Sequence, residues 1–133
     1  MIEGIGIDIV EVSRIEKAVK RLGFTFLKRI FTDKEIKNSK KRKWPYEYLA
    51  ARFATKEAVF KALNDGLDGS ISWRNIEILN DKDGRPVVTL YGKAKKLQER
   101  KKVGKIHVSV SHIKEYAIAT AALVRKNNEK TRI

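Results

Sequence analysis

The stretch GIGIDIVEVSRI, residues 4–15, places one carboxylate inside an almost continuous apolar run. The alternation over residues 2–11 predicts a strand, in which Ile5 and Ile9 lie on one face and Asp8 lies on the other. Both faces are mostly apolar, so we expect the strand to be covered on both sides. A carboxylate in such surroundings is costly unless its charge is compensated, which makes Asp8 a candidate functional residue.

A second carboxylate lies in an apolar setting further along the chain. Pro45 suits the first turn of a helix that we expect over residues 45–64. On a helical wheel centred on Phe53, Glu57 falls inside the apolar arc and Lys61 falls at its edge. The alternative interpretation is an exposed Glu57–Lys61 pair, worth about 0.3–0.5 kcal/mol.

Two carboxylates on apolar faces favour a hard cation with oxygen ligands. The chain contains no Cys, so disulfides and thiolate metal sites are excluded. Mg²⁺ fits such a pair because it accepts one or two carboxylates and takes its other ligands from water and phosphate. The sequence spacing does not itself bring Asp8 and Glu57 together.

The remaining patterns predict an α+β fold with a small, mainly antiparallel sheet packed with helices. Capping-box sequences at residues 13–16 and 32–35 predict helix starts, the first at about residue 14. We expect a single domain over residues 1–124 and a polar tail over residues 125–133. The first helix is expected to end at Gly23, and a further helical segment is expected from Phe24. A hairpin is expected over 75–90, with its turn at Asp83–Gly84, followed by a helix over 92–103. Two strands are expected over 105–124, joined at about 113–115.

The chain is strongly basic, with 30 Lys and Arg against 16 Asp and Glu in 133 residues and a net charge of +14. This balance favours an acidic partner, a phosphorylated cofactor or nucleic acid, with a solvated basic surface as the alternative. We expect the run Lys40–Lys43 to be a solvated loop. No apolar run is long enough to span a membrane and no signal-peptide pattern is present, so we expect a cytoplasmic protein without a membrane partner.

Three motifs together resemble one known family. They are GIGIDIVEVSRI at 4–15, RFATKEAVFKAL at 52–63 and VSVSHIKEYAIATAAL at 108–123. Residues 53–61 match every position of a nine-residue motif. The motif begins with Trp or Phe and any two residues, continues with Lys, Glu and either Ala or Ser, and ends with any two residues and Lys. In this order and at this spacing the motifs resemble the small class of 4′-phosphopantetheinyl transferases, the holo-acyl-carrier-protein synthase family, over about residues 2–124.

The resemblance implies a 4′-phosphopantetheinyl transferase-like fold that assembles as a homotrimer with active sites between subunits. It implies transfer of the 4′-phosphopantetheine arm of coenzyme A to a serine of apo acyl carrier protein, leaving adenosine 3′,5′-bisphosphate. It also implies a need for Mg²⁺ and a place in fatty acid biosynthesis, a part of lipid metabolism. The alternatives are a basic nucleic-acid-binding module and a Mg²⁺-dependent phosphodiesterase. The first leaves both carboxylates unexplained, and the second usually needs more carboxylate ligands.

The same resemblance assigns roles to individual residues. Asp8 and Glu57 match the family's metal ligands, which are expected to be catalytic. Lys61 matches the family's active-site lysine, expected to contact a phosphate of coenzyme A or to assist the leaving group, and its i,i+4 pairing with Glu57 is expected to hold it in place. Lys56 is the other lysine of the block, either a coenzyme A contact or a solvent-exposed helper. The remaining expected coenzyme A contacts are Arg52, Gly84, Arg85, Pro86, Ser111 and His112. Outside this family, the histidine would be an ordinary half-buried strand residue and the Gly-Arg-Pro segment an ordinary turn.

A basic stripe at helical spacing directly follows the strand that carries Asp8. Its members are Arg14, Lys17 and Arg21, and Lys28 extends it. Acyl carrier proteins of the kind that this family modifies are small and acidic, so the resemblance implies that this stripe binds the carrier. Opposite charges mainly speed the encounter and fix its orientation. A solvated helix face is the alternative.

Overall fold

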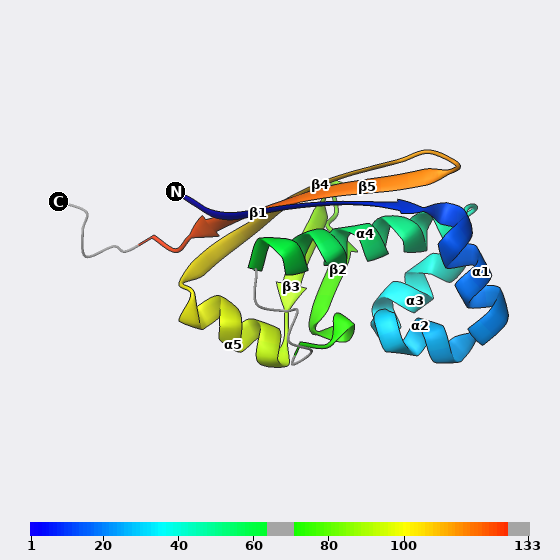
Figure 1. Ribbon diagram of the computed structural model, residues 1–133, viewed down its shortest axis with the longest axis horizontal. Helices are drawn as coiled ribbons and strands as arrows, with labels where there is room; N and C mark the ends of the chain where they lie inside the picture. Colours follow the sequence, from blue (N-terminus) through cyan, green and yellow to red (C-terminus); the bar gives the residue numbers. More distant parts are fainter. Residues whose placement is uncertain (64–70, 128–133) are drawn as a thin grey trace.

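Strand β1 (Ile2–Glu11) pairs antiparallel with β5 (Tyr116–Arg125), and β5 pairs on its other side with β4 (Val103–His112). The computed structural model describes residues 1–63 and 71–127. Helix α4 (Pro45–Leu63) lies along one face of this three-stranded sheet (Figure 1). The predicted α+β fold and its antiparallel sheet are therefore confirmed.

The shorter elements lie around α4 (Figure 1). Near its start are α1 (Val12–Leu22), α2 (Phe24–Ile30) and α3 (Asp33–Lys40). The 3-10 helix η2 (Trp73–Asn75) and the strands β2 (Ile76–Asn80) and β3 (Pro86–Leu90) lie beside its middle, and α5 (Gly92–Arg100) lies towards its other end. The β2–β3 hairpin forms a separate two-stranded sheet, with the turn where the sequence predicts it. The predicted helix over 92–103 ends early because Lys102 has a positive φ of 56° and Val103 already belongs to β4.

Two glycines of β1 allow α4 to lie directly against the strand. A Cβ at Gly6 would overlap the carbonyl oxygen of Ala58, and a Cβ at Gly4 would overlap that of Ala62. Two residues of strand cover about the same length as four residues of helix. The next position on this face of β1, Asp8, therefore lies at the level of residues 54–57 of the helix.

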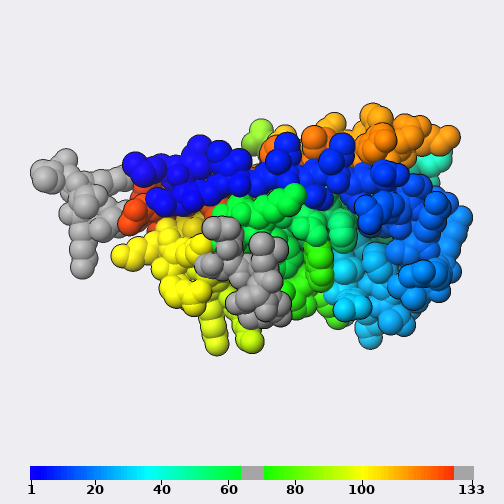
Figure 2. Space-filling model, in the orientation of Figure 1, coloured from blue at the N-terminus to red at the C-terminus, as the bar shows by residue number. Residues whose placement is uncertain are grey.

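The opposite face of β1 is exposed in the single chain, which corrects the prediction that both faces are covered. Ile5, Ile7 and Ile9 are 69%, 55% and 61% exposed. Their partners in β5 include Ile118, which pairs with Ile9 and is 38% exposed. Figure 2 shows β1 as a continuous surface strip along one side of the molecule. An apolar sheet face of this kind is unusual for a monomer and marks an interaction surface.

Of the two predicted capping boxes, one is confirmed and one is wrong. The Thr32 hydroxyl accepts from the Glu35 N–H at 3.3 Å, and the Glu35 carboxylate accepts from the Thr32 N–H at 2.9 Å. Helix α1 begins at Val12, without a side-chain cap. The Val12 N–H instead donates to the Glu115 carbonyl at 2.9 Å, so the β4–β5 turn provides the partner that a local cap would otherwise supply.

The start of the predicted polar tail belongs to the sheet. Arg125 is the last residue of β5, and its N–H donates to the Met1 carbonyl at 2.9 Å. The residues of the tail from 128 to 133, like residue 64 of the helix predicted over 45–64, lie outside the described residues.

Replacing Gly6 by Ala is expected to lower the free energy of unfolding by about 1–3 kcal/mol, the usual cost of overpacking. The added Cβ has no space because the backbone of α4 occupies it. The midpoint of urea unfolding, followed by circular dichroism, measures the loss. Thr89→Ala, at an exposed strand position, is the control and should leave the midpoint almost unchanged. Equal midpoints for both variants would contradict the close contact.

Candidate active site

The strand carboxylate and the helix carboxylate face one cavity. Asp8 and Glu57 line a space of about 370 Å³ together with Arg14 and the rings of Phe26 and Phe53. The Asp8 side chain is 17% exposed. The close contact between β1 and α4 therefore brings together the two acids that the sequence singles out. We call this space the acid-pair cavity.

The two carboxylates influence each other electrostatically. Burial raises the pKa of Glu57 above its ordinary value, and the negative charge of Asp8 raises this pKa further. The ammonium of Lys61 acts in the opposite direction and lowers it. The pKa of Glu57 is raised overall because burial and Asp8 together outweigh Lys61.

Lys61 is held by β1 rather than by its own helix. Its ammonium donates to the Ile7 carbonyl at 3.0 Å and to the Asp8 carboxylate at 3.2 Å. The sequence predicts an i,i+4 pairing with Glu57, and among the described residues the ion pair is made with Asp8 instead. The Lys61 side chain is 50% exposed, so its charge lies at the rim of the acid-pair cavity.

The donor set of this cavity fits a Mg²⁺ ion. No group of three or more His, Cys, Asp or Glu residues that would enclose a metal is found among residues 1–63 and 71–127. Two neighbouring carboxylates in an open cavity are nonetheless what Mg²⁺ accepts, since it keeps several waters and binds substrate phosphates. Asp8 and Glu57 are the residues that would hold it.

Four of the eight expected coenzyme A contacts line a second, larger cavity of about 580 Å³. It is lined by Arg52, Gly84, Pro86 and His112, which come from α4, the β2–β3 hairpin and β4. The imidazole of His112 lies 3.9 Å from the Glu47 carboxylate, which also lines the cavity. We call this space the basic cavity.

A phenol ring between two guanidinium groups forms one wall of the basic cavity. Arg42 and Arg52 lie 4.8 Å and 4.5 Å from the centroid of the Tyr48 ring. Arg52 also donates to the side-chain oxygen of Asn80 at 2.9 Å. The Tyr48 hydroxyl and Arg52 Nε are buried and have no hydrogen-bond partner among the described residues. Unpaired buried polar atoms that line a cavity indicate a polar ligand.

Several lining residues of the basic cavity are absent from the sequence prediction. The run Lys40–Lys43 is exposed as predicted, although Lys40 is the last residue of α3, and its members Arg42 and Lys43 also line the cavity wall, followed by Trp44. A basic run that ends in an aromatic residue directly before a helix is the signal that would have indicated this role. Tyr48 precedes Arg52 by four residues in the predicted helix, and this spacing would have indicated their contact. Asn80 carries no such signal, because only the folded chain brings it to Arg52.

Three predicted coenzyme A contacts lie elsewhere. Lys56 is fully buried and lines neither cavity, so the solvent-exposed alternative is wrong, whereas its predicted contact with coenzyme A stays a prediction. Burial lowers the pKa of Lys56, and the nearby Glu35 carboxylate opposes this shift. Ser111 pairs with Ile118 and lies on the exposed face of the sheet, opposite to His112. Arg85 is exposed in the hairpin turn and is not part of the cavity wall.

The basic stripe borders the acid-pair cavity. Arg14 lines that cavity directly, and Lys17 and Arg21 continue along the exposed side of α1. Lys28 is exposed on α2, with its ammonium 5.3 Å from the Phe24 ring centroid. A negatively charged partner that binds this stripe would therefore lie next to Asp8 and Glu57.

A model of the 4′-phosphopantetheinyl transferase superfamily matches residues 4–121. The chain belongs to this superfamily. This transferase is 42% identical over 123 residues to a holo-[acyl-carrier-protein] synthase of Syntrophus aciditrophicus, which covers 92% of the chain and 96% of the relative. It is 44% identical over 119 residues to the synthase of the same name from Chloroherpeton thalassium, covering 90% and 95%.

Solved structures share the fold of this transferase. The holo-[acyl-carrier-protein] synthase of Neisseria meningitidis superposes with a TM-score of 0.85 at 37% identity, covering 94% of this chain and all of that one (100%). The synthase of Helicobacter pylori, solved in complex with coenzyme A, gives a TM-score of 0.79 at 35% identity, with coverage of 90% and 99%. Among the described helices of the transferase, none has the length and apolar character needed to cross a membrane.

Asp8→Asn is expected to lower the pKa of Glu57, because it removes a like charge while burial still keeps that pKa above its ordinary value. NMR titration of the ¹³C-labelled Glu57 carboxyl measures the shift. Glu16→Gln removes a carboxylate of α1 that pairs with Lys20, and this control should leave the Glu57 titration unchanged. An identical Glu57 pKa in wild type and Asp8→Asn would show that the two acids do not interact.

Proposed function

We propose that this chain transfers the 4′-phosphopantetheine group of coenzyme A to a serine of apo acyl carrier protein. The observation that carries the proposal is that Asp8 and Glu57 line one cavity, while Lys61 forms an ion pair with Asp8. These are the residues of the strand motif and of the Lys-Glu block, in a chain matched by carrier-protein synthases over about nine tenths of its length. The reaction belongs to fatty acid biosynthesis in the cytoplasm.

The residues of the acid-pair cavity act on the diphosphate of coenzyme A. Asp8 and Glu57 would hold Mg²⁺, which would neutralise the charge that develops on the phosphate oxygens during transfer. Lys61 adds a positive charge at the rim, where its bonds to Ile7 and Asp8 restrict its movement. Since β1 and α4 are rigid elements, both carboxylates keep their places as the reaction proceeds.

The basic cavity binds the adenosine 3′,5′-bisphosphate end of coenzyme A. Arg42, Lys43 and Arg52 supply positive charge there, and the unpaired Arg52 Nε and Tyr48 hydroxyl supply polar groups that a ligand can satisfy. Gly84 and Pro86 of the hairpin turn provide a flat, uncharged wall suited to the adenine ring.

The arrangement of the two cavities supports a homotrimer with shared sites. They have no lining residue in common, because α4 turns Tyr48 and Arg52 toward one and Phe53 and Glu57 toward the other. One coenzyme A molecule bridges them most simply when each cavity comes from a different copy. The exposed isoleucine face of β1 is the surface through which the copies pack.

The basic stripe of α1 orients the carrier protein. Arg14 lies in the wall of the acid-pair cavity, so an acidic helix bound along Arg14, Lys17 and Arg21 presents its serine to the diphosphate. The alternatives predicted from sequence fit less well. A nucleic-acid-binding module or a phosphodiesterase explains the charge but neither the cavity geometry nor the relatives.

Asp8→Asn and Glu57→Gln are each expected to reduce transfer by about 10²–10³-fold, as found for other groups that stabilise charge in a transition state. Mass spectrometry of apo carrier protein after incubation with coenzyme A and Mg²⁺ measures the phosphopantetheine adduct. Glu16→Gln is the control, because this carboxylate lies outside the acid-pair cavity. Near wild-type transfer by either site variant would show that the ligand assignment is wrong, and no adduct with wild type would refute the function.

Ile7→Lys is expected to dissociate the oligomer and to abolish transfer, because a charge on the isoleucine face opposes its burial. Sedimentation velocity measures the oligomeric state, and the transfer assay measures activity. Thr89→Lys places the same charge on an exposed strand position of the β2–β3 hairpin and should change neither. An active wild-type monomer would contradict the shared site.

A further inference from the structure

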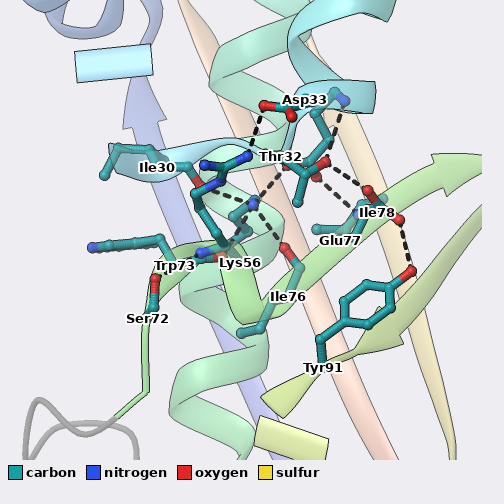
Figure 3. Close-up of polar contacts among 12 residues, drawn as sticks. Ile30, Thr32, Asp33, Lys56, Ser72, Trp73, Ile76, Glu77, Ile78 and Tyr91 are labelled. Atoms are coloured by element: carbon teal, nitrogen blue, oxygen red, sulfur yellow. Dashed lines mark hydrogen bonds and ion pairs between the residues drawn. The ribbon is translucent and has the colours of Figure 1, made fainter. Parts of the chain in front are cut away.

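The ammonium group of Lys56 lies in the interior among oxygen atoms of several elements (Figure 3). Lys56, fully buried, donates to the carbonyl oxygens of Ile30 at 2.9 Å, Trp73 at 3.1 Å and Ile76 at 2.7 Å. Its ammonium also lies 2.7 Å from the Glu35 carboxylate. An ammonium has three N–H groups, and four oxygens surround this one. Lys56 therefore has no donor left for a substrate.

These oxygens belong to segments that are far apart in the sequence. The Ile30 carbonyl is at the C-terminal end of α2, where a helix lacks internal partners and favours a positive charge. The Trp73 and Ile76 carbonyls lie in η2 and at the start of β2. Lys56 of α4 thus joins three elements that the chain reaches before and after that helix.

The carboxylate that faces Lys56 is itself saturated. Glu35 accepts from the N–H groups of Thr32 and Ile78, each at 2.9 Å. The Thr32 hydroxyl donates to Glu77 at 2.6 Å, and the Tyr91 hydroxyl donates to the same carboxylate at 3.1 Å (Figure 3). A buried polar network whose members are all paired fixes one arrangement of the chain around it.

One branch of this network leads to the acid-pair cavity. Trp73, whose carbonyl binds Lys56, stacks its ring on Phe53 at 5.0 Å and meets Phe60 edge-on at 5.2 Å. Phe53 lines the acid-pair cavity, and Glu57 directly follows Lys56 in α4. A change in the rotation of α4 about its axis would therefore move Glu57 relative to β1.

The other branch leads to the basic cavity. Strand β2 begins at Ile76, whose carbonyl binds Lys56, and ends at Asn80, whose side chain binds Arg52. Arg52 lies one helical turn before Lys56 in α4. The strand and the helix are consequently fastened to each other at two points, one of them in the wall of the basic cavity.

We propose that Lys56 is a positioning residue for the transfer reaction. It fixes α4 against α2, α3, η2 and β2, so that Glu57 faces Asp8 while Arg52 faces the basic cavity. The inference rests on the proposed function and replaces the predicted direct contact with coenzyme A. A displacement of reacting groups by about 1 Å can cost as much as 10²-fold in rate, so such a tie affects catalysis without touching substrate.

Lys56→Met and Glu35→Gln test the tie, since each weakens the ion pair while keeping the side chain similar in size. Both are compared below their melting temperatures with wild type and with Lys37→Met, an exposed lysine of α3. Two readouts are taken for each protein. One is kcat for transfer with coenzyme A, apo carrier protein and Mg²⁺, and the other is Mn²⁺ binding in the presence of coenzyme A, followed by electron paramagnetic resonance.

We expect kcat and Mn²⁺ affinity to fall by about tenfold or more in both variants, with an unchanged pH profile and a non-additive double variant. Lys37→Met should match wild type. Folded variants that keep wild-type Mn²⁺ affinity, or that change the pH profile, would overturn the positioning role. If Lys56→Met does not fold, Glu35→Gln alone decides in the same way. Wild type that binds Mn²⁺ but transfers nothing refutes the proposed function and leaves the Mn²⁺ comparison intact.

Discussion

The direct contact between β1 and α4 is the constraint on which the active site depends. A strand and a helix can pack this closely only where no side chain lies between them. Gly4 and Gly6 have no side chain, and they lie opposite the carbonyls of Ala62 and Ala58. The neighbouring strand β5, which pairs with β1, contributes Ala117, Ala119 and Ala121, all buried and all small. Because the gap is this narrow, an acid on the strand and an acid on the helix share one cavity.

In this chain of net charge +14, the positive groups and the two carboxylates of the acid-pair cavity are concentrated in different places. Positive groups gather where phosphates and an acidic partner are expected, in the basic cavity and along α1. Among the described residues, the two carboxylates of the acid-pair cavity form the site that the proposed function assigns to Mg²⁺. Under that proposal, two carboxylates would suffice for the metal, and the basic groups elsewhere would bind phosphate and the acidic partner.

The helices and strands, and the charged residues that stand out in their apolar patterns, were predictable from sequence. The contacts between distant segments of the chain were not. Strand alternation and the helical wheel identified Asp8 and Glu57, because a charge among apolar neighbours stands out. The wheel failed for Lys56 because α4 is buried on nearly all sides, so position on the wheel does not distinguish interior from surface. Strand alternation could have shown that Ser111 and His112 lie on opposite faces of the sheet, because neighbouring strand residues point in opposite directions.

Local signals also failed where distant segments supplied the partner. The capping sequence at residues 13–16 was not used because the Glu115 carbonyl, about a hundred residues later, binds the Val12 N–H. The capping box of Thr32 and Glu35 formed, and its carboxylate also holds Lys56 and the Ile78 N–H. A pattern that spans three or four residues does not predict the contacts of Glu35 with Lys56 and Ile78, which lie far away in the sequence.

The stacked pair of guanidinium groups on Tyr48 has a thermodynamic consequence. Arg42 and Arg52 repel each other across one ring, and neither meets a carboxylate in an ion pair within the described part of the chain. An anion bound beside the two guanidinium groups would offset this repulsion. Because a ligand that binds only the folded chain stabilises it, the proposed binding of coenzyme A at the basic cavity would raise the free energy of unfolding.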